Sequence, residues 1–243
     1  MNAFSRSELL LSINGIKTLK KKHIAIFGLG GVGSYIVETL ARSGIEHFTL
    51  IDDDVITISN LNRQLYALTS TLNKKKVEVA KNRTLDINPN CQIQIYDTFV
   101  SKETINRFDF KNFDYIIDAI DTISAKILLI EKAKLYDIPI ISSMGTGNKL
   151  DPRQFMITDI NQTKICPLAR VIRYELKKRN IQNVKVLYST EKPINVTNSH
   201  LEQKLLQQEN PNKHQIPGSV AFVPRVAGIL IACLLYTSPS PRD

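Results

Sequence analysis

The sequence has little cysteine, no apolar stretch long enough for a membrane span and no export signal. Its three cysteines, Cys91, Cys166 and Cys233, include no C-x-x-C pair, which argues against a disulfide framework and a four-cysteine zinc site. The apolar helix predicted over 225–235 is far shorter than the ~20 residues of a membrane span. Residues 1–22 lack the apolar core and cleavage pattern of a signal peptide. These absences predict a cytoplasmic protein.

The composition is that of an ordinary globular chain with an excess of positive charge. A length of 243 residues, with 43% apolar and 23% charged residues, favours one domain with appendages over two independent domains. The formal net charge of +9 and the pI near 9.4 favour a polyanionic partner or an acidic membrane surface.

The chain is organised around a glycine-rich turn. Residues 23–27 form a short apolar run typical of a buried parallel strand, and residues 34–41 repeat apolar positions at helical spacing. Between them Gly28, Gly30 and Gly33 fit G-x-G-x-x-G. In this context Gly28 allows a sharp turn, Gly30 lets the backbone approach a phosphate, and Gly33 lets helix and strand pack closely. The segment therefore predicts a phosphate site at a helix N-terminus.

A second feature of this site is the acidic cluster 52–54, which closes the predicted strand 47–51. Asp52 follows Gly33 by 19 residues, the separation at which a carboxylate accepts hydrogen bonds from a ribose. The two features together predict an adenine nucleotide, and they leave open whether it is a dinucleotide or a mononucleotide such as ATP.

The fold class predicted from the whole pattern is α/β, with a doubly wound, mainly parallel sheet, a Rossmann-like turn and a C-terminal α/β elaboration. We expect one domain over 1–233, with the elaboration at about 151–233, a mobile insert at about 193–217 and a non-native Ser-Pro tail over 234–243. Further strands are predicted at 91–96, 113–120, 138–143, 155–158, 184–188 and 219–223, and further helices within 1–22, 73–87, 122–136, 167–179 and 225–235.

A set of polar residues bears on the type of nucleotide. Residues 62–64 (Asn-Arg-Gln), Lys76 and Asp121 offer positive charge for phosphates and a carboxylate for Mg²⁺, which attack on an α-phosphate needs and hydride transfer does not. Each has a plainer interpretation: Arg63 as a surface ion-pair partner, Lys76 as a solvated lysine, and Asp121 as a helix N-cap.

The order of these features resembles the ubiquitin-activating-enzyme-like superfamily of adenylating enzymes, whose members include ThiF and MoeB. The resemblance is carried by Gly28-Leu29-Gly30-Gly31-Val32-Gly33-Ser34, Asp52, Asn62-Arg63-Gln64, Lys76 and Asp118-Ala119-Ile120-Asp121. Within it the chain is similar to the tRNA threonylcarbamoyladenosine dehydratases, on Phe4-Ser5-Arg6, Ala41-Arg42-Ser43-Gly44, Asp86-Ile87-Asn88-Pro89 and Gly147-Asn148-Lys149-Leu150-Asp151-Pro152. The resemblance covers roughly residues 4–233.

The resemblance implies ATP and Mg²⁺ as cofactors, a tRNA carrying threonylcarbamoyladenosine as substrate, and a homodimer. It also implies a set of site residues. Phosphates would be held by Gly28, Gly30, Gly31, Gly33, Asn62, Arg63, Gln64 and Lys76, the ribose by Asp52, and Mg²⁺ by Asp121. Arg6 matches an arginine that reaches the partner subunit's ATP site, so the implied catalytic set is Arg6, Arg63, Lys76 and Asp121. A sulfur-transfer protein is a further partner that it implies.

Two alternatives remain open at this point. One is an adenylating enzyme for a ubiquitin-like sulfur carrier, which the missing C-x-x-C pairs disfavour. The other is an NAD-dependent oxidoreductase or a non-catalytic nucleotide-binding module. Cys166, ahead of Pro167, fits a small buried residue better than a catalytic thiol and stays outside the catalytic set.

A basic segment stands out in the elaboration. Residues 164–192 carry two thirds of the formal excess charge, and a tRNA substrate would need such cations beside the ATP site. The segment, with residues 177–179 at its centre, is therefore predicted to contact tRNA, the alternative being an ordinary solvated helix face.

Overall fold

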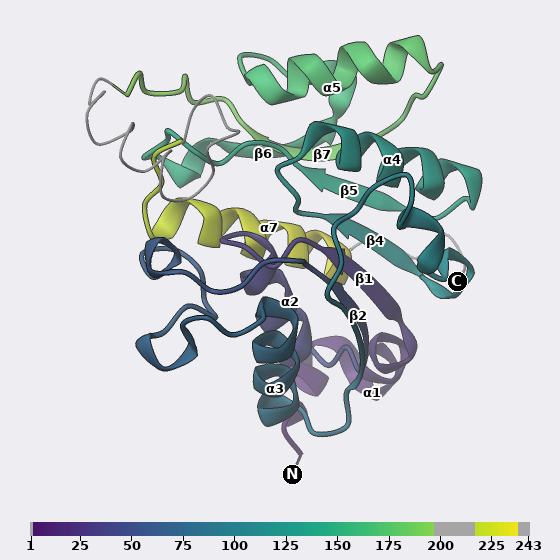
Figure 1. Cartoon of the computed structure of the whole chain (residues 1–243). Coiled ribbons are helices and arrows are strands. Elements are labelled where there is room, and N and C mark those ends of the chain that lie inside the picture. The colour runs from purple at the N-terminus through teal and green to yellow at the C-terminus, as the bar shows by residue number, and fades with distance from the viewer. Residues whose placement is uncertain (1, 197–216, 238–243) are drawn as a thin grey trace.

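A seven-stranded sheet in the order β3-β2-β1-β4-β5-β7-β6 forms the centre of the molecule (Figure 1). The computed structural model describes residues 2–196 and 217–237. All strand pairs are parallel except β6 with β7, so the predicted doubly wound α/β fold is confirmed. The strands are β1 (His23–Phe27), β2 (His47–Ile51), β3 (Gln92–Tyr96), β4 (Tyr115–Asp118), β5 (Ile140–Ser143), β6 (Phe155–Asp159) and β7 (Lys185–Ser189).

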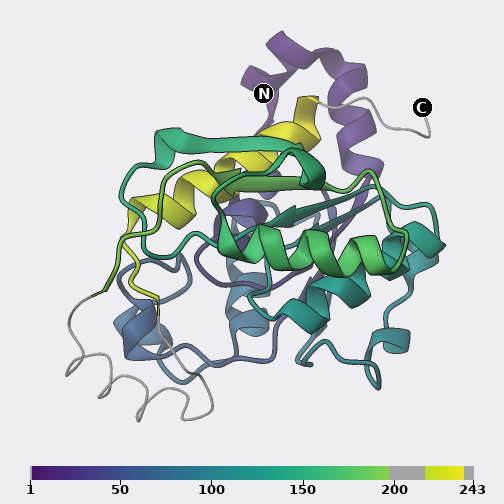
Figure 2. The ribbon, with the colours of Figure 1, turned by 90° about the horizontal axis from the view of Figure 1, so that it is seen from above.

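Helices cover both faces of this sheet (Figures 1 and 2). α2, α3 and α7 lie on one face, and α4 and α5 on the other. The helices are α1 (Ser5–Lys21), α2 (Gly33–Arg42), α3 (Lys76–Ile87), α4 (Ile123–Leu135), α5 (Pro167–Lys178) and α7 (Phe222–Thr237).

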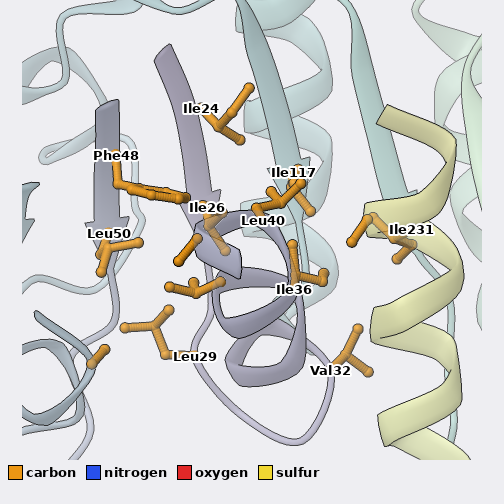
Figure 3. Packing of buried hydrophobic residues seen from close by; sticks show 14 of the residues in the cluster. Ile24, Ile26, Leu29, Val32, Ile36, Leu40, Phe48, Leu50, Ile117 and Ile231 are labelled. Atoms are coloured by element: carbon orange, nitrogen blue, oxygen red, sulfur yellow. The ribbon is translucent and has the colours of Figure 1, made fainter. Parts of the chain in front are cut away.

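The core beside the glycine turn joins β1, β2, α2 and α7. Ile26 and Leu50 of the sheet, Ile36 of α2 and Ile231 of α7 belong to one cluster and are all fully buried, and Figure 3 shows Ile26 and Ile36 between Leu50 on one side and Ile231 on the other. Burying one such side chain stabilises the fold by about 1.5–3 kcal/mol. α2 is thereby fixed against the sheet, and its N-terminus is fixed at the end of β1.

The strand register brings the predicted site segments to one edge. Phe27 pairs with Ile51 and with Asp118, and Asp118 pairs with Ser142. The residues that follow these strands therefore emerge side by side at what we call the carboxyl edge of the sheet. The opposite edge, where the parallel strands begin, is the amino edge.

The strand predicted at 219–223 is wrong. Residues 217–220 are irregular and Phe222 already begins α7. Pro224 lies in the first turn of the helix, where a missing N–H breaks no intrahelical bond. The run of Val220, Phe222 and Val223 looks like a strand locally, but Val220 and Val223 pack into the core beside the sheet whereas Phe222 is exposed.

Part of the predicted insert and tail lies outside the described residues. This applies to 197–216 of the insert and to 238–243 of the tail. α7 runs on through Thr237, and Leu234 and Leu235 pack against the core. Within the described ranges, the helices are too short or too polar to cross a membrane.

Candidate nucleotide-binding site

The glycine turn has the close packing that its spacing predicts. Gly28 has a φ of +92°, and a Cβ atom there would lie 2.7 Å from the Ala119 carbonyl oxygen. A Cβ atom on Gly33 would lie only 1.8 Å from the Gly28 carbonyl oxygen. At Gly30 the nearest described atom is Gln64 Nε2, at 3.8 Å, so the turn stays open there. The start of α2 is thus drawn tightly onto β1 and follows directly on the open part of the turn, a place where helix N-termini bind anions.

Replacing Gly33 with alanine should destabilise the protein by about 3 kcal/mol, because backbone must move to admit the methyl group. Gly145 is the matched control, since no described atom lies within 4 Å of a Cβ placed there. Gly145→Ala should change stability by less than about 0.5 kcal/mol. Urea unfolding measures both variants. Equal unfolding free energies would contradict the close approach at Gly33.

Asp52 is held next to the turn by the backbone. Its Oδ2 accepts from the Leu29 N–H at 2.6 Å, and its Oδ1 accepts from the Asp54 N–H at 2.9 Å. Burial raises the pKa of Asp52, and the Lys76 ammonium and the Leu29 N–H oppose that rise. The carboxylate is thus oriented beside the turn, where a ribose would lie.

Lys76 is buried, so its interpretation as a solvated lysine is wrong. Its side chain is 4% exposed, and Nζ lies 2.5 Å from Asp54 Oδ2 and 3.6 Å from Asp52 Oδ1. Asp52, Asp53 and Asp54 each offer a carboxylate oxygen within 4.8 Å of the others. Since Lys76 neutralises two of the three, this cluster is an ion-pair group at the base of the site, and it fits a metal poorly.

Arg63 and Gln64 close the site from the loop after β2. Arg63 Nη1 donates to the Ser59 carbonyl oxygen at 2.8 Å and to Asn62 Oδ1 at 3.0 Å. A Cβ atom on Gly31 would lie 3.6 Å from Arg63 Cγ. The aliphatic part of the Arg63 side chain therefore lies beside the glycine turn, while its guanidinium is held by the loop that carries it.

The structure places the segment that leads into α7 next to the site, which the sequence did not indicate. Asn62 Nδ2 donates to the Ser219 carbonyl oxygen at 3.0 Å, across 157 residues. A Cβ atom on Gly31 would lie 3.0 Å from Pro224 Cβ. The segment leading into α7 thus borders the site, and no motif in it could have revealed this.

The loop after β5 is hydrogen-bonded to this segment that leads into α7. Asn148 accepts from the Ile194 N–H at 2.8 Å through its carbonyl and from the Gly218 N–H at 2.6 Å through Oδ1. Lys149 Nζ donates to the Glu191 carbonyl oxygen at 2.6 Å, and burial lowers the pKa of this lysine. Cys166, which caps α5 nearby, is buried.

Asp121 lies exposed on the loop between β4 and α4, beside the glycine turn. The N-cap of α4 is Thr122, so the N-cap interpretation of Asp121 is wrong. An exposed carboxylate that follows a strand at the same edge as the glycine turn fits a Mg²⁺-bound nucleoside triphosphate.

Arg6 is the one predicted catalytic residue that this chain does not bring to the site. Phe4 is buried against Gly44, in the turn that leads into β2, which anchors the beginning of α1 at the amino edge. A strand of five residues separates the two edges by about 16 Å. In Figures 1 and 2, α1 lies away from the loop that carries Arg63. Arg6 therefore points to no group of its own chain's nucleotide site.

The basic segment is only partly placed as predicted. α5 begins at the carboxyl edge, and its C-terminal end leads through 180–184 into the start of β7 at the amino edge (Figure 1). Residues 177–179 are thus at the far end of the helix from the nucleotide site. Arg179 is also paired with Glu131 and Glu175, and Lys178 with Glu175. The expectation that this trio lies beside the ATP site is wrong.

Comparison with known proteins adds a family to this geometry. The family model described as ThiF matches residues 4–238. A tRNA threonylcarbamoyladenosine dehydratase of Bacillus subtilis is 42% identical over 233 residues, covering 95% of this chain and 92% of that protein. A molybdopterin-synthase adenylyltransferase of Haemophilus influenzae is 31% identical over 141 residues, covering 57% of this chain and 58% of that protein.

Solved structures of tRNA threonylcarbamoyladenosine dehydratases have the same fold as this chain. Crystal structures of Escherichia coli tRNA N6-threonylcarbamoyladenosine dehydratase in complex with AMP and with ATP superpose with TM-scores of 0.84 and 0.83, at 30% and 29% identity. Each covers 96% of this chain and 92% of the solved one.

Proposed function

The chain belongs to the ThiF family and, within it, to the tRNA threonylcarbamoyladenosine dehydratases, and we propose that it activates the carboxylate of threonylcarbamoyladenosine in tRNA with ATP and then cyclises it. The protein is an ATP-dependent, adenylate-forming enzyme. The observation that carries this function is the convergence of the glycine turn, Asp52, Arg63 and Asp121 at one edge of the sheet.

In the proposed reaction the substrate carboxylate attacks the α-phosphate of ATP, and pyrophosphate leaves. A nitrogen of the same modified side chain then attacks the acyl-adenylate, and AMP leaves as the ring closes. If the acyl group is first transferred to a thiol, AMP leaves in that transfer and the thiol leaves as the ring closes. The net change in the nucleoside is the loss of one water molecule.

The chain's own residues would divide this work. Backbone N–H groups of the turn at Gly30, Gly31 and Gly33 would hold phosphates, and Asp52 would hold the ribose. Gly28, whose N–H donates to the Ile51 carbonyl oxygen at 2.8 Å, would serve by allowing the sharp turn. Asn62, Arg63, Gln64 and Lys76 would neutralise phosphate charge. Lys76 would do so only after turning from Asp54. Asp121 would hold Mg²⁺, which when bound supplies positive charge to the phosphates.

Mass spectrometry of nucleosides tests the function directly. Incubating tRNA that carries threonylcarbamoyladenosine with the enzyme and ATP should yield the nucleoside lighter by one water, together with AMP and pyrophosphate. Omitting ATP is the control. An unchanged nucleoside, with the tRNA intact, would contradict the proposal. Tight binding of NADH in a calorimetric titration, without binding of ATP, would favour the oxidoreductase instead.

The apolar surface of α1 supports a homodimer. Leu9, Leu10 and Ile13 are 85%, 88% and 60% exposed on α1, which carries Arg6 and is kinked at Ser12. Apolar side chains gathered in this way mark a protein contact. We propose that a second copy covers them and that Arg6 enters the partner's nucleotide site.

Three further assignments complete the proposal. We propose that residues 1–233 act as one adenylating domain, because β6 and β7 continue the sheet that carries the nucleotide site. A tRNA substrate would place the enzyme in the cytoplasm. A sulfur-transfer protein remains a proposed partner, with no assigned surface.

The proposed tRNA surface lies at the near end of α5. Lys164, Arg170 and Lys192 are all exposed: Lys164 and Arg170 lie just before and within the first turn of α5, and Lys192 follows the carboxyl end of β7. Reversing all three to Glu should weaken tRNA binding and lower its salt slope by about 1 for each lost phosphate contact. The matched control reverses Lys177 and Lys178, at the far end, and should leave the slope near wild type. Labelled tRNA titrated across a salt series measures both. Equal losses in the two variants would remove the near end from the tRNA site.

A further inference from the structure

A lysine is buried in the core immediately behind the site. Lys126 is 0% exposed, and its Nζ donates to Asp118 Oδ2 at 3.0 Å, to the Ser143 carbonyl oxygen at 2.7 Å and to Ser142 Oγ at 3.3 Å. Ser142 Oγ donates to the same Asp118 oxygen at 2.5 Å. The ammonium thus links the ends of β4 and β5.

Stability alone does not explain this pair. Removing two charges from water is costly, and well-packed neutral residues of similar volume are often at least as stable. Lys126 also lies in the first turn of α4, where the helix dipole disfavours a cation. A charged pair kept in such a place is best explained by what it holds in position.

What it holds is the loop that carries Asp121. The loop begins at Asp118, whose Oδ1 accepts from the Ile120 N–H at 3.1 Å. It ends at Thr122, whose carbonyl accepts from the Lys126 N–H at 3.1 Å. Lys126 therefore bonds to the loop's end through its backbone and to its start through its side chain.

The loop is fixed against its neighbours as well. The Ala119 N–H donates to the Phe27 carbonyl oxygen at 2.8 Å, and the Ala119 carbonyl packs on Gly28. Ser143, which receives the third bond of the ammonium, is the last residue of β5 before the loop at 144–147. One side chain thereby fixes two loops of the carboxyl edge relative to the glycine turn.

We propose that Lys126 is a positioning residue for the metal-nucleotide site: by joining Asp118 to Ser143 it fixes the 119–122 loop so that Asp121 faces the phosphates. This rests on the proposed function, because Asp121 has that task only if the chain binds Mg-ATP. Lys126 touches neither substrate nor metal.

The test removes the charges without leaving one of them unpaired. Asp118→Asn with Lys126→Met keeps the side-chain lengths and leaves no isolated buried charge. The control is Leu176→Ala, a buried position near the far end of α5, which lowers stability without touching the edge. Calorimetric titration with ATP, with and without Mg²⁺, is the binding readout. All proteins are measured well below their unfolding midpoints.

We expect the double variant to bind ATP without Mg²⁺ as the wild type does and to lose the gain in affinity that Mg²⁺ gives. Pyrophosphate exchange should fall about 100-fold, the scale of a 1 Å misplacement. Leu176→Ala should keep both properties.

The proposal is overturned if the double variant keeps the Mg²⁺ gain and the exchange rate while Asp121→Asn loses them. It is also overturned if Leu176→Ala loses the gain equally, because general destabilisation then suffices. Should Asp121→Asn itself keep both properties, the metal role of Asp121 fails first, and the positioning role falls with it.

Discussion

Replacing Asp121 with alanine should lower pyrophosphate exchange by about 1,000-fold and leave the fold intact. The carboxylate is exposed at the carboxyl edge beside the glycine turn, and an electrostatic group aimed at phosphates contributes on the order of 10²–10³ in rate. Losing the metal's positive charge should add to that. Incorporation of labelled pyrophosphate into ATP measures the effect, and circular dichroism checks the fold.

Asp86→Ala is the matched control, since Asp86 is an exposed aspartate on α3. It should exchange pyrophosphate at the wild-type rate. An Asp121→Ala enzyme that still exchanges near the wild-type rate would remove this residue from the metal site.

Replacing Arg6 with alanine should lower exchange by about 100-fold and leave dimerisation nearly unchanged. A guanidinium directed at the phosphates supplies charge in the transition state, whereas the proposed contact between copies rests on Leu9, Leu10 and Ile13. Lys17→Ala, which removes an exposed cation of α1 beyond the kink at Ser12, should retain wild-type exchange. Exchange assays and analytical ultracentrifugation measure the two properties separately.

Mixing the inactive Arg6→Ala and Asp121→Ala proteins tests whether Arg6 acts in the partner's site. A heterodimer would contain one complete site, with Asp121 from one copy and Arg6 from the other. Random exchange of subunits should therefore restore about a quarter of the wild-type activity. A mixture that stays inactive, although native mass spectrometry shows heterodimers, would sink the role in trans.

The order of the segments along the chain was by itself enough to predict at which edge of the sheet the nucleotide site lies. The run 23–27, the glycines after it and the helix at 34–41 are consecutive, so local geometry fixes the strand, the turn and the helix N-terminus. Asp52 and Asp121 could be placed because residues that follow parallel strands meet at one edge. No long-range contact was needed for these inferences.

Other features depended on contacts that no local pattern contains. Lys76 looks like one of three solvated lysines in the sequence and is buried against Asp52 and Asp54 in the fold. The carbonyl of Ser219 reaches Asn62 across 157 residues. In each case the neighbour is distant in sequence, so spacing could not identify it.

The direction in which a helix runs and the burial of a side chain were also decided by the tertiary structure. The charge of residues 177–179 is evident in the sequence, but only the path of α5 places it away from the nucleotide edge. Phe4 anchors Arg6 at the amino edge. Lys126 reads as an ordinary helical lysine until packing buries it beside Asp118. Sequence fixes which residues follow which strand, whereas burial and the side from which a helix approaches are set by packing among elements that are far apart in the chain.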